Sequence, residues 1–300
     1  MQMGAKLEVS IGICAYNEAK NIGYLLQSVV EQITRDIFIS EIIVVSDGSF
    51  DATNSIVEMA VKEQKGIKLI ALGKRSGKYA AINAFLRAAR SEVLALVSAD
   101  LILDPYAIEH LCRPFLTDPG LGMTGARPLP KNSKDIFFGY LAHLLWDLHH
   151  QLALVQPKFG ELVAFKKIDR DIPETLVDEE ELAALVKSKD YSLLYVPASI
   201  VYNKGPMLVR DFLRQRRRIF AGHMMLKKRY GYSVATVNSA RIMKCLFKKE
   251  LRIYIRQTHW LMAAMFLEAI GRFLGWWDAC FHKTDYLWPI AESTKELHAS

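Results

Sequence analysis

Short apolar runs alternate with amphipathic stretches over the first 130 residues of the chain. Clusters of β-branched and other apolar residues predict strands over residues 9–15, 41–46, 67–72, 92–98 and 122–125. Between them, apolar residues recur at helical spacing, which predicts helices over residues 21–32, 51–63, 78–90 and 105–116. Strands and helices in regular succession are typical of crossover connections. We therefore expect an α/β fold with a mainly parallel, Rossmann-like sheet covered by helices on both faces.

The regular alternation ends after Pro130. From there the pattern predicts helices over residues 134–155, 179–189 and 207–229, and strands over residues 160–167 and 193–202. A helical C-terminal extension follows, and it is apolar over residues 253–277. Glu268 and Arg272 interrupt that stretch well short of the roughly 20 apolar residues that a spanning helix needs. We expect it to lie in a membrane interface, or to pack on the rest of the chain or on a second subunit.

Polar and glycine residues follow four of the predicted strands, at residues 16–18, 47–51, 73–78 and 98–100. In parallel sheets, ligands bind beyond the carboxyl ends of the strands. We expect Asp47 and Asp100 at the tips of neighbouring strands, near a basic loop that contains Arg75 and Lys78. Carboxylates placed in this way suit Mg²⁺ or Mn²⁺, the usual bridge to a diphosphate. The chain has no G-x-G-x-x-G after the first strand and no P-loop motif, which disfavours a dehydrogenase and a P-loop nucleotidase.

The composition and charge narrow the class of protein further. Apolar residues make up 51% and charged residues 24%, which excludes a disordered chain. The net charge is only +7, but residues 204–256 hold fifteen Lys and Arg against two acidic residues. Such a segment attracts nucleotide phosphates or an anionic membrane surface. We expect no nucleic acid as a partner, because the segment lacks interleaved aromatic residues on which bases could stack.

The four cysteines lie far apart without a C-x-x-C pair, so they indicate neither a disulfide framework nor a zinc site. The first residues show no cationic and apolar signal pattern. We therefore expect a cytoplasmic protein. The basic segment and the apolar extension predict that it is bound peripherally to the inner face of the cell membrane.

Seven short motifs lie along the chain at residues 13–18, 44–53, 77–84, 98–100, 160–166, 178–182 and 215–219. In this order they resemble the motifs of the family 2 glycosyltransferases, which have the A-type nucleotide-diphospho-sugar transferase fold. The last one is similar to the Q-x-x-R-W motif of the membrane-associated branch. The resemblance implies an inverting transferase that uses a nucleotide-diphosphate sugar as donor and a glycan or lipid-linked molecule as acceptor. It also implies a catalytic domain over residues 1–232, made of a nucleotide-sugar-binding half (7–128) and an acceptor-binding half (129–232), followed by an extension over residues 233–300.

The resemblance also implies roles for individual residues. The donor-binding residues are Ala15, Tyr16, Glu18, Asp47, Lys78 and Asp100. Asp100, the last residue of the D-x-D equivalent, is implied to bind the Mg²⁺ or Mn²⁺. Gly160 and Phe165 lie on the acceptor side. Either Glu179 or Asp178 is the general base, with Glu179 in register with the family's Asp, and Gln215 and Arg218 contact the acceptor and the leaving diphosphate. Glu180 and Glu181 are expected as a solvated first helical turn.

Two positions depart from the family pattern. Ser98 replaces the first Asp of D-x-D, and Ile219 replaces the Trp of Q-x-x-R-W. The loss of the Trp favours a single addition, or a nonsugar acceptor, over processive synthesis. Both departures leave open a protein that binds nucleotide sugars without catalysis. A nucleotidyltransferase is a further alternative, but it would need a glycine-rich basic segment after the first strand, where this chain has Tyr16, Asn17 and Glu18.

Overall fold

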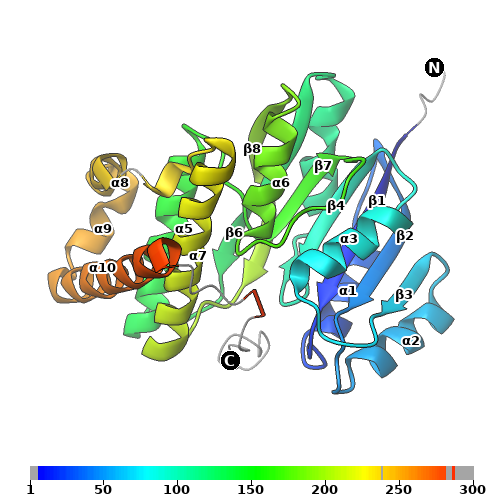
Figure 1. Cartoon of the computed structure of the whole chain (residues 1–300), viewed down its shortest axis with the longest axis horizontal. Coiled ribbons are helices and arrows are strands. Elements are labelled where there is room, and N and C mark those ends of the chain that lie inside the picture. Colours follow the sequence, from blue (N-terminus) through cyan, green and yellow to red (C-terminus); the bar gives the residue numbers. More distant parts are fainter. Residues whose placement is uncertain (1–5, 238, 282–285, 288–300) are drawn as a thin grey trace.

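The computed structural model describes residues 6–237, 239–281 and 286–287. In this part of the chain eight strands form one sheet in the order β3-β2-β1-β4-β7-β6-β8-β5 (Figure 1). The strands are β1 (Leu7–Ala15), β2 (Ile37–Ser46), β3 (Ile67–Ala71), β4 (Val93–Ser98), β5 (Ile102–Leu103), β6 (Leu121–Pro130), β7 (Leu162–Lys166) and β8 (Ser192–Asn203). Strands β1 to β4 pair in parallel, whereas β7 is antiparallel to both β4 and β6. The chain thus has the expected α/β fold, with a parallel half and a mixed half.

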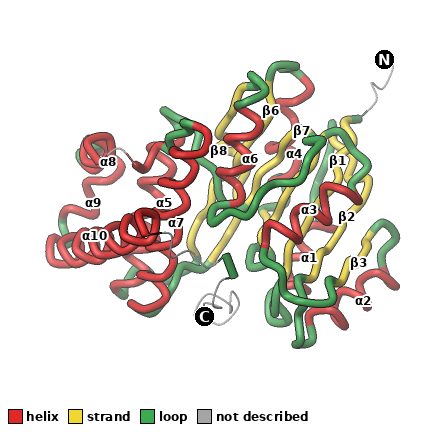
Figure 2. The backbone as a smooth tube through the Cα atoms, viewed as in Figure 1, coloured by secondary structure: helices red, strands yellow, loops and turns green. Residues whose placement is uncertain are grey.

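Helices cover both faces of the sheet (Figure 2). On one face α1 (Ile22–Val30), α2 (Thr53–Glu63) and α4 (Ala107–Cys112) share a core with Ile11 and Ile13 of β1. On the other face α3 (Lys78–Ala88) and α6 (Asp178–Lys187) share a core with Leu94 and Leu96 of β4. Strands buried on both faces need apolar residues at successive positions, which explains the continuous apolar runs in the sequence.

A third core joins α5 (Phe137–Ala153) and α7 (Val209–Tyr230) to the C-terminal helices. Those helices are α8 (Ser239–Leu246), α9 (Arg252–Ile255) and α10 (Thr258–Phe281). Helix α10 packs closely on α7, because a Cβ atom at Gly271 would lie 2.6 Å from Cβ of Arg216. In the described part of the chain no helix is long and apolar enough to cross a membrane. The apolar stretch predicted over residues 253–277 is divided between α9 and α10, and α10 packs on the rest of the chain through one of its faces.

The remaining differences from the predicted elements have local causes. The helix predicted over residues 105–116 ends as α4 at Cys112 and continues as the 3₁₀ helix η1 (Arg113–Leu116). Pro114 explains the change, because a proline lacks the N–H that the α-helical ladder needs. Other short 3₁₀ helices are η2 (Ala235–Val237) and η3 (Lys249–Leu251). The two-residue strand β5 was not predicted, because so short a run carries no periodicity.

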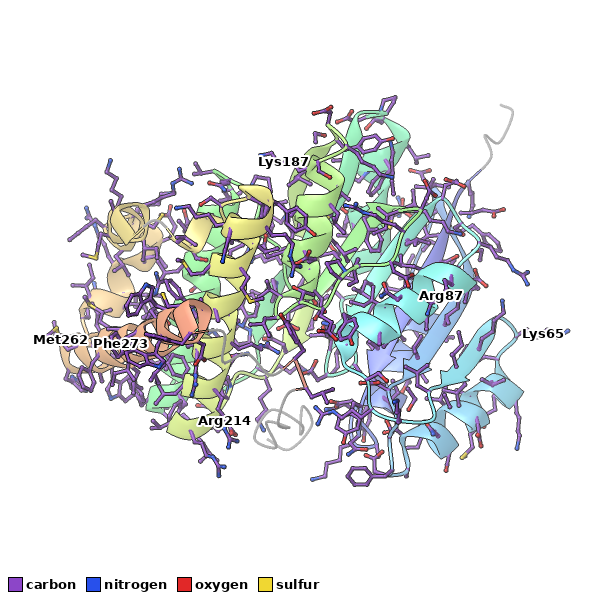
Figure 3. All side chains as sticks on the ribbon, in the orientation of Figure 1. Lys65, Arg87, Lys187, Arg214, Met262 and Phe273 are labelled. Carbon is purple, nitrogen blue, oxygen red and sulfur yellow. The ribbon has the colours of Figure 1, made fainter. Side chains whose placement is uncertain are left out.

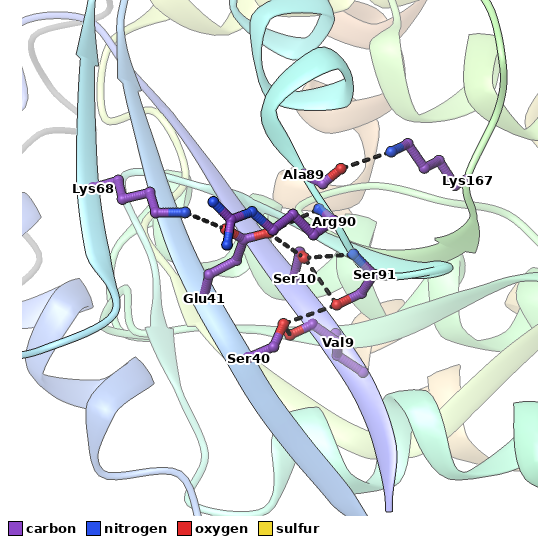
Figure 4. A network of polar contacts seen from close by, with 9 residues as sticks. All are labelled: Val9, Ser10, Ser40, Glu41, Lys68, Ala89, Arg90, Ser91 and Lys167. Carbon is purple, nitrogen blue, oxygen red and sulfur yellow. Dashed lines mark hydrogen bonds and ion pairs between the residues drawn. The ribbon is translucent and has the colours of Figure 1, made fainter.

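A network of polar side chains links the parallel strands away from their carboxyl ends (Figure 4). The carboxylate of Glu41 is 4% exposed and accepts hydrogen bonds from Ser10 Oγ (2.8 Å), Lys68 Nζ (2.6 Å) and the backbone N–H of Arg90 (2.8 Å). Burial would raise the pKa of Glu41, but these donors outweigh it and hold the pKa below its usual value. The network joins β1, β2 and β3 to the segment that leads into β4, and so holds the strands whose far ends build the site.

Candidate active site

A cavity of about 770 Å³ lies at the carboxyl ends of β1, β2 and β4 and extends to α5, α6 and α7. Eleven of the twelve expected site residues line it: Ala15, Tyr16, Glu18, Asp47, Lys78, Asp100, Gly160, Asp178, Glu179, Gln215 and Arg218. Phe165 is the exception. It is fully buried in the core beneath α3 and α6, because successive residues of β7 alternate between the faces of the sheet. Its expected place on the acceptor side was wrong.

Asp47 organises the loop that follows β3 at one end of the cavity. Its Oδ1 accepts a hydrogen bond from the backbone N–H of Ser76 (2.7 Å), and its Oδ2 accepts one from Gly77 (2.8 Å). The loop can approach this closely because residue 48 is a glycine with φ +69°, whose Cβ would lie 2.4 Å from the backbone nitrogen of Arg75. Asp47 and Asp100 do not follow neighbouring strands as expected, because β1 lies between β2 and β4.

Aromatic and guanidinium groups form a rim beside Asp47. The guanidinium carbon of Arg75 lies 4.1 Å from the ring centroid of Tyr16, and the ring of Phe50 stands edge-on to Tyr16 at 6.3 Å. Phe50 is 80% exposed, which is unusual for a large apolar side chain beside a cavity. The sequence analysis did not select Phe50, although an aromatic residue in a polar strand-end loop was a signal. These faces could stack on a nucleotide base.

The carboxylates of Asp178 and Glu179 lie at the start of α6 but have different partners. Nζ of Lys78 forms an ion pair with Oε1 of Glu179 (2.6 Å) and a hydrogen bond to Oγ of Ser98 (3.3 Å). Burial would raise the pKa of Glu179, but the charge and hydrogen bond of Lys78 outweigh it and lower the pKa. Glu179 is therefore an ionised ion-pair partner at neutral pH.

Asp178 differs from Glu179 in its partners and in the direction of its pKa shift. It is 7% exposed, and its Oδ1 has no hydrogen-bond partner in the described part of the chain. Burial raises the pKa of Asp178 to about 6, with Glu179 adding to the rise and Lys78 opposing it. A carboxylate can accept a proton during a reaction when its pKa is near neutrality and one of its oxygens has no hydrogen-bond partner.

Arg218, on α7, belongs to the same charge cluster in the cavity. It interacts electrostatically with Asp178, Glu179, Glu161 and Asp100. Glu161 was not among the expected residues, although it directly follows Gly160. Burial, reinforced by the charges of Asp100 and Glu179, raises the pKa of Glu161 to about 7. The cavity therefore holds more acidic groups than the sequence motifs indicated.

The expectation that Glu180 and Glu181 are solvated was wrong, since they are 3% and 1% exposed. Glu180 accepts hydrogen bonds from the backbone N–H of Phe159 (3.0 Å) and the hydroxyl of Tyr232 (3.0 Å). Glu181 accepts hydrogen bonds from the hydroxyl of Tyr230 (2.5 Å) and Nη1 of Arg229 (3.1 Å). The end of α7 thus covers the first turn of α6 and fixes its orientation, so that the two residues before Glu180 face the cavity.

The cavity fits a divalent cation that takes only part of its ligands from protein. Among the described residues no group of three or more His, Cys, Asp and Glu side chains could hold a metal ion. Asp100 nevertheless brings a carboxylate to the wall of the cavity. Mg²⁺ is commonly bound through one or two carboxylates plus phosphate oxygens and waters, so this donor set suits a cation that arrives with a diphosphate.

Comparisons with known proteins bear on the family and the fold of the chain. The model of the glycosyl transferase family 2 matches residues 10–170. Poly-beta-1,6-N-acetyl-D-glucosamine synthase of Staphylococcus epidermidis is 24% identical over 241 residues, which are 76% of this chain and 58% of that protein. The chain therefore spans less than two thirds of the length of this curated relative.

Two solved structures show the same fold. The mannosyltransferase PcManGT from Pyrobaculum calidifontis, in complex with GDP-Man and Mn²⁺, is 18% identical with a TM-score of 0.67, covering 94% of this chain and 89% of that one. Glucosyl-3-phosphoglycerate synthase from Mycobacterium tuberculosis, in complex with Mn²⁺, UDP and phosphoglyceric acid, is 18% identical with a TM-score of 0.53, covering 73% and 78% of the two chains. These likenesses confirm the predicted fold class.

Proposed function

Because the chain belongs to glycosyl transferase family 2, we propose that it transfers a hexosyl group from a nucleotide-diphosphate donor to an acceptor hydroxyl, with inversion at the anomeric carbon. The observation that carries this proposal is one cavity in which Asp178 and Glu179 lie with Lys78 and Arg218. A proton acceptor and two cations are the groups that such a transfer needs. The solved relatives described above are complexes with GDP-Man or UDP, which supports a nucleotide as the donor's carrier.

We assign the general base to Asp178 and a supporting role to Glu179. Asp178 takes the proton of the acceptor hydroxyl while that oxygen bonds to the anomeric carbon from the face opposite the diphosphate. The bond between the anomeric carbon and the diphosphate oxygen breaks, and its electron pair stays on the diphosphate. Lys78 and Arg218 stabilise the charge that develops there. Glu179 is less suited as base, because its ion pair with Lys78 lowers its pKa.

A bound Mg²⁺ or Mn²⁺ would add electrostatic stabilisation of the leaving diphosphate. Asp100 is the carboxylate that we assign to hold it, since it follows β4 at the donor end of the cavity. The complexes of relatives with Mn²⁺ support the choice of ion.

Donor binding can be tested before any acceptor is known. We expect one nucleoside diphosphate, from a panel that includes UDP and GDP, to raise the melting temperature when Mn²⁺ is present. At 100 times the dissociation constant, binding to the folded state adds about 2.7 kcal/mol of stability. The Asp47→Ala variant should lose most of this shift, because Asp47 holds the 73–77 loop. Glu63 is exposed on α2, so the control variant Glu63→Ala should keep the full rise in melting temperature. A panel without any shift, or an equal shift in Asp47→Ala, would contradict the proposed donor site.

The acceptor end of the cavity favours a lipid-linked acceptor over a free glycan. Half-buried apolar side chains from α5 and α8 line it: Phe138, Leu145 and Ile242. Burying hydrocarbon there would stabilise the complex by about 25 cal/mol per Å² of apolar surface. Sugar label from the donor should therefore partition into an organic phase with the product. Label recovered only in a water-soluble glycan would favour the alternative acceptor.

We further propose that the enzyme contacts an anionic membrane surface through α10. The face of α10 that points away from α7 exposes Met262, Phe266, Phe273, Trp276 and Trp277. Met262 and Phe273 lie on the outer side of the molecule (Figure 3). Exposed Lys249, Arg252 and Arg256 precede this helix. Apolar and aromatic side chains bordered by basic residues are typical of helices that lie in the membrane interface.

Vesicle binding tests this surface. The wild-type protein should sediment with vesicles of anionic phosphatidylglycerol, and Phe266→Ser with Phe273→Ser should weaken the partitioning by about tenfold or more, because each buried Phe contributes about 1.5–3 kcal/mol. Met59 is similarly exposed but lies on α2, so Met59→Ser is the matched control. Equal partitioning of the double variant and the control would contradict membrane contact through α10.

A further inference from the structure

Strand β7 brings a second carboxylate to the tip of β4. The two strands are antiparallel, with Val97 opposite Leu162, so the next pair along is Ser98 and Glu161. The backbone N–H of Ser98 donates a hydrogen bond to the carbonyl of Glu161 (3.0 Å). Glu161 therefore lies beside the position where the D-x-D pattern has its first Asp and this chain has a serine. Its carboxylate comes from the residue before β7 instead of from β4 itself.

The side chain of Glu161 belongs to the same charge cluster as Asp100. Both residues line the cavity, and their carboxylates repel each other electrostatically. Lys78 and Arg218 interact with these carboxylates, and Lys158 also interacts with Glu161. A diphosphate would add further negative charge to this set. A cation between Asp100 and Glu161 would offset the repulsion between their carboxylates.

Asn203 provides an independent observation that points to a ligand. This residue ends β8, lines the cavity and is 5% exposed. Its Nδ2 donates a hydrogen bond to Oε1 of Glu161 (3.1 Å), and a carboxylate acceptor requires the amide nitrogen on that side. Its Oδ1 has no hydrogen-bond partner in the part of the chain that the structure describes. An unsatisfied buried carbonyl oxygen is unfavourable by about 1–3 kcal/mol, which a bound ligand would relieve.

We propose that Glu161 and Asn203 join Asp100 as oxygen ligands of the divalent cation that accompanies the donor diphosphate, an inference that rests on the proposed function. Carboxylate and amide oxygens are ligands that Mg²⁺ and Mn²⁺ accept, and phosphate oxygens and waters complete such sites. Glu161 supplies the carboxylate that Ser98 lacks. The site is thus built from three strand ends: those of β4 and β8, and the residue that leads into β7.

Mn²⁺ binding, followed by the loss of the free-ion signal in electron paramagnetic resonance, tests this ligand set without any turnover. Mn²⁺ is titrated into the full chain alone and then with the nucleoside diphosphate that stabilises it. We expect Glu161→Gln and Asn203→Ala each to weaken Mn²⁺ binding by about tenfold or more, the scale seen when groups around a metal are removed. Glu161→Asp should keep part of the affinity, and Glu63→Gln should match the wild type.

The outcomes separate this inference from the proposed function. Unchanged Mn²⁺ affinity in Glu161→Gln or in Asn203→Ala, with a wild-type melting profile, would overturn the ligand set even where the nucleotide binds. If Glu161→Gln does not fold, Asn203→Ala decides. A wild-type protein that binds Mn²⁺ but no nucleotide would contradict the proposed function, while the variants would still report on the ligands. A wild-type protein that binds no Mn²⁺, with or without nucleotide, would overturn the inference.

Discussion

The Asp178→Asn variant should lose about 10²- to 10⁴-fold in kcat, the usual contribution of a positioned general base. Donor binding should change little, because Asp178 lies at the start of α6 and the donor-side loop is held by Asp47. The amide keeps the shape of the side chain but cannot accept the acceptor's proton. The rate of sugar transfer in a single turnover tests the expected loss of activity. A nucleotide-binding measurement on the same variant tests the expectation that donor binding changes little. Retained kcat in Asp178→Asn together with a loss in Glu179→Gln would move the base to Glu179.

The pH dependence of the same reaction identifies the base independently. The base must be deprotonated to act, so wild-type kcat should rise as pH increases through about 6 and then level off, following the raised pKa of Asp178. In Glu179→Gln the inflection should move to lower pH, because the charge of Glu179 contributes to that rise. An inflection that stays in place would argue that Glu179 does not influence the base.

The second large effect is expected at Asp100. Asp100→Ala should lower the transfer rate by about 10²- to 10³-fold or more, the range found when one group that stabilises transition-state charge is removed. The variant takes away the carboxylate that we assign to the cation at the donor end, while Lys78 and Arg218 remain. Asp100→Asn keeps an oxygen ligand but not the charge. Its transfer rate should lie between the rates of the wild type and of Asp100→Ala. Melting curves of both variants control for damage to the fold.

The parallel half of the fold was predictable from the sequence because its signals are local. Strands buried on both faces have continuous apolar runs, and β1, β2 and β4 each end in a polar segment. The order of the strands is not a local property. Asp47 and Asp100 are separated by β1, and the antiparallel placement of β7 beside β4 depends on a chain return that no periodicity encodes.

Eleven of the twelve residues selected from the sequence line one cavity, but the contacts between them could not be predicted from the sequence. The motif at residues 178–182 could not distinguish Asp178 from Glu179, because what separates them is the ion pair between Glu179 and Lys78, 101 residues away. Glu180 looks solvated in sequence because a helix start tolerates acidic residues, yet Tyr232 covers it. Glu161 and Asn203 carry no motif signal, since they meet only through the pairing of strands.

The central claim is that this cavity transfers a sugar from a nucleotide-diphosphate donor. The most direct measurement is the release of nucleoside diphosphate from GDP-mannose, UDP-glucose and UDP-N-acetylglucosamine, with Mn²⁺ and a lipid-linked acceptor, by the wild type and by Asp100→Ala. We predict release from one donor by the wild type, with sugar label in the lipid product, and release at or near background by the folded variant. Full turnover by Asp100→Ala would contradict the account.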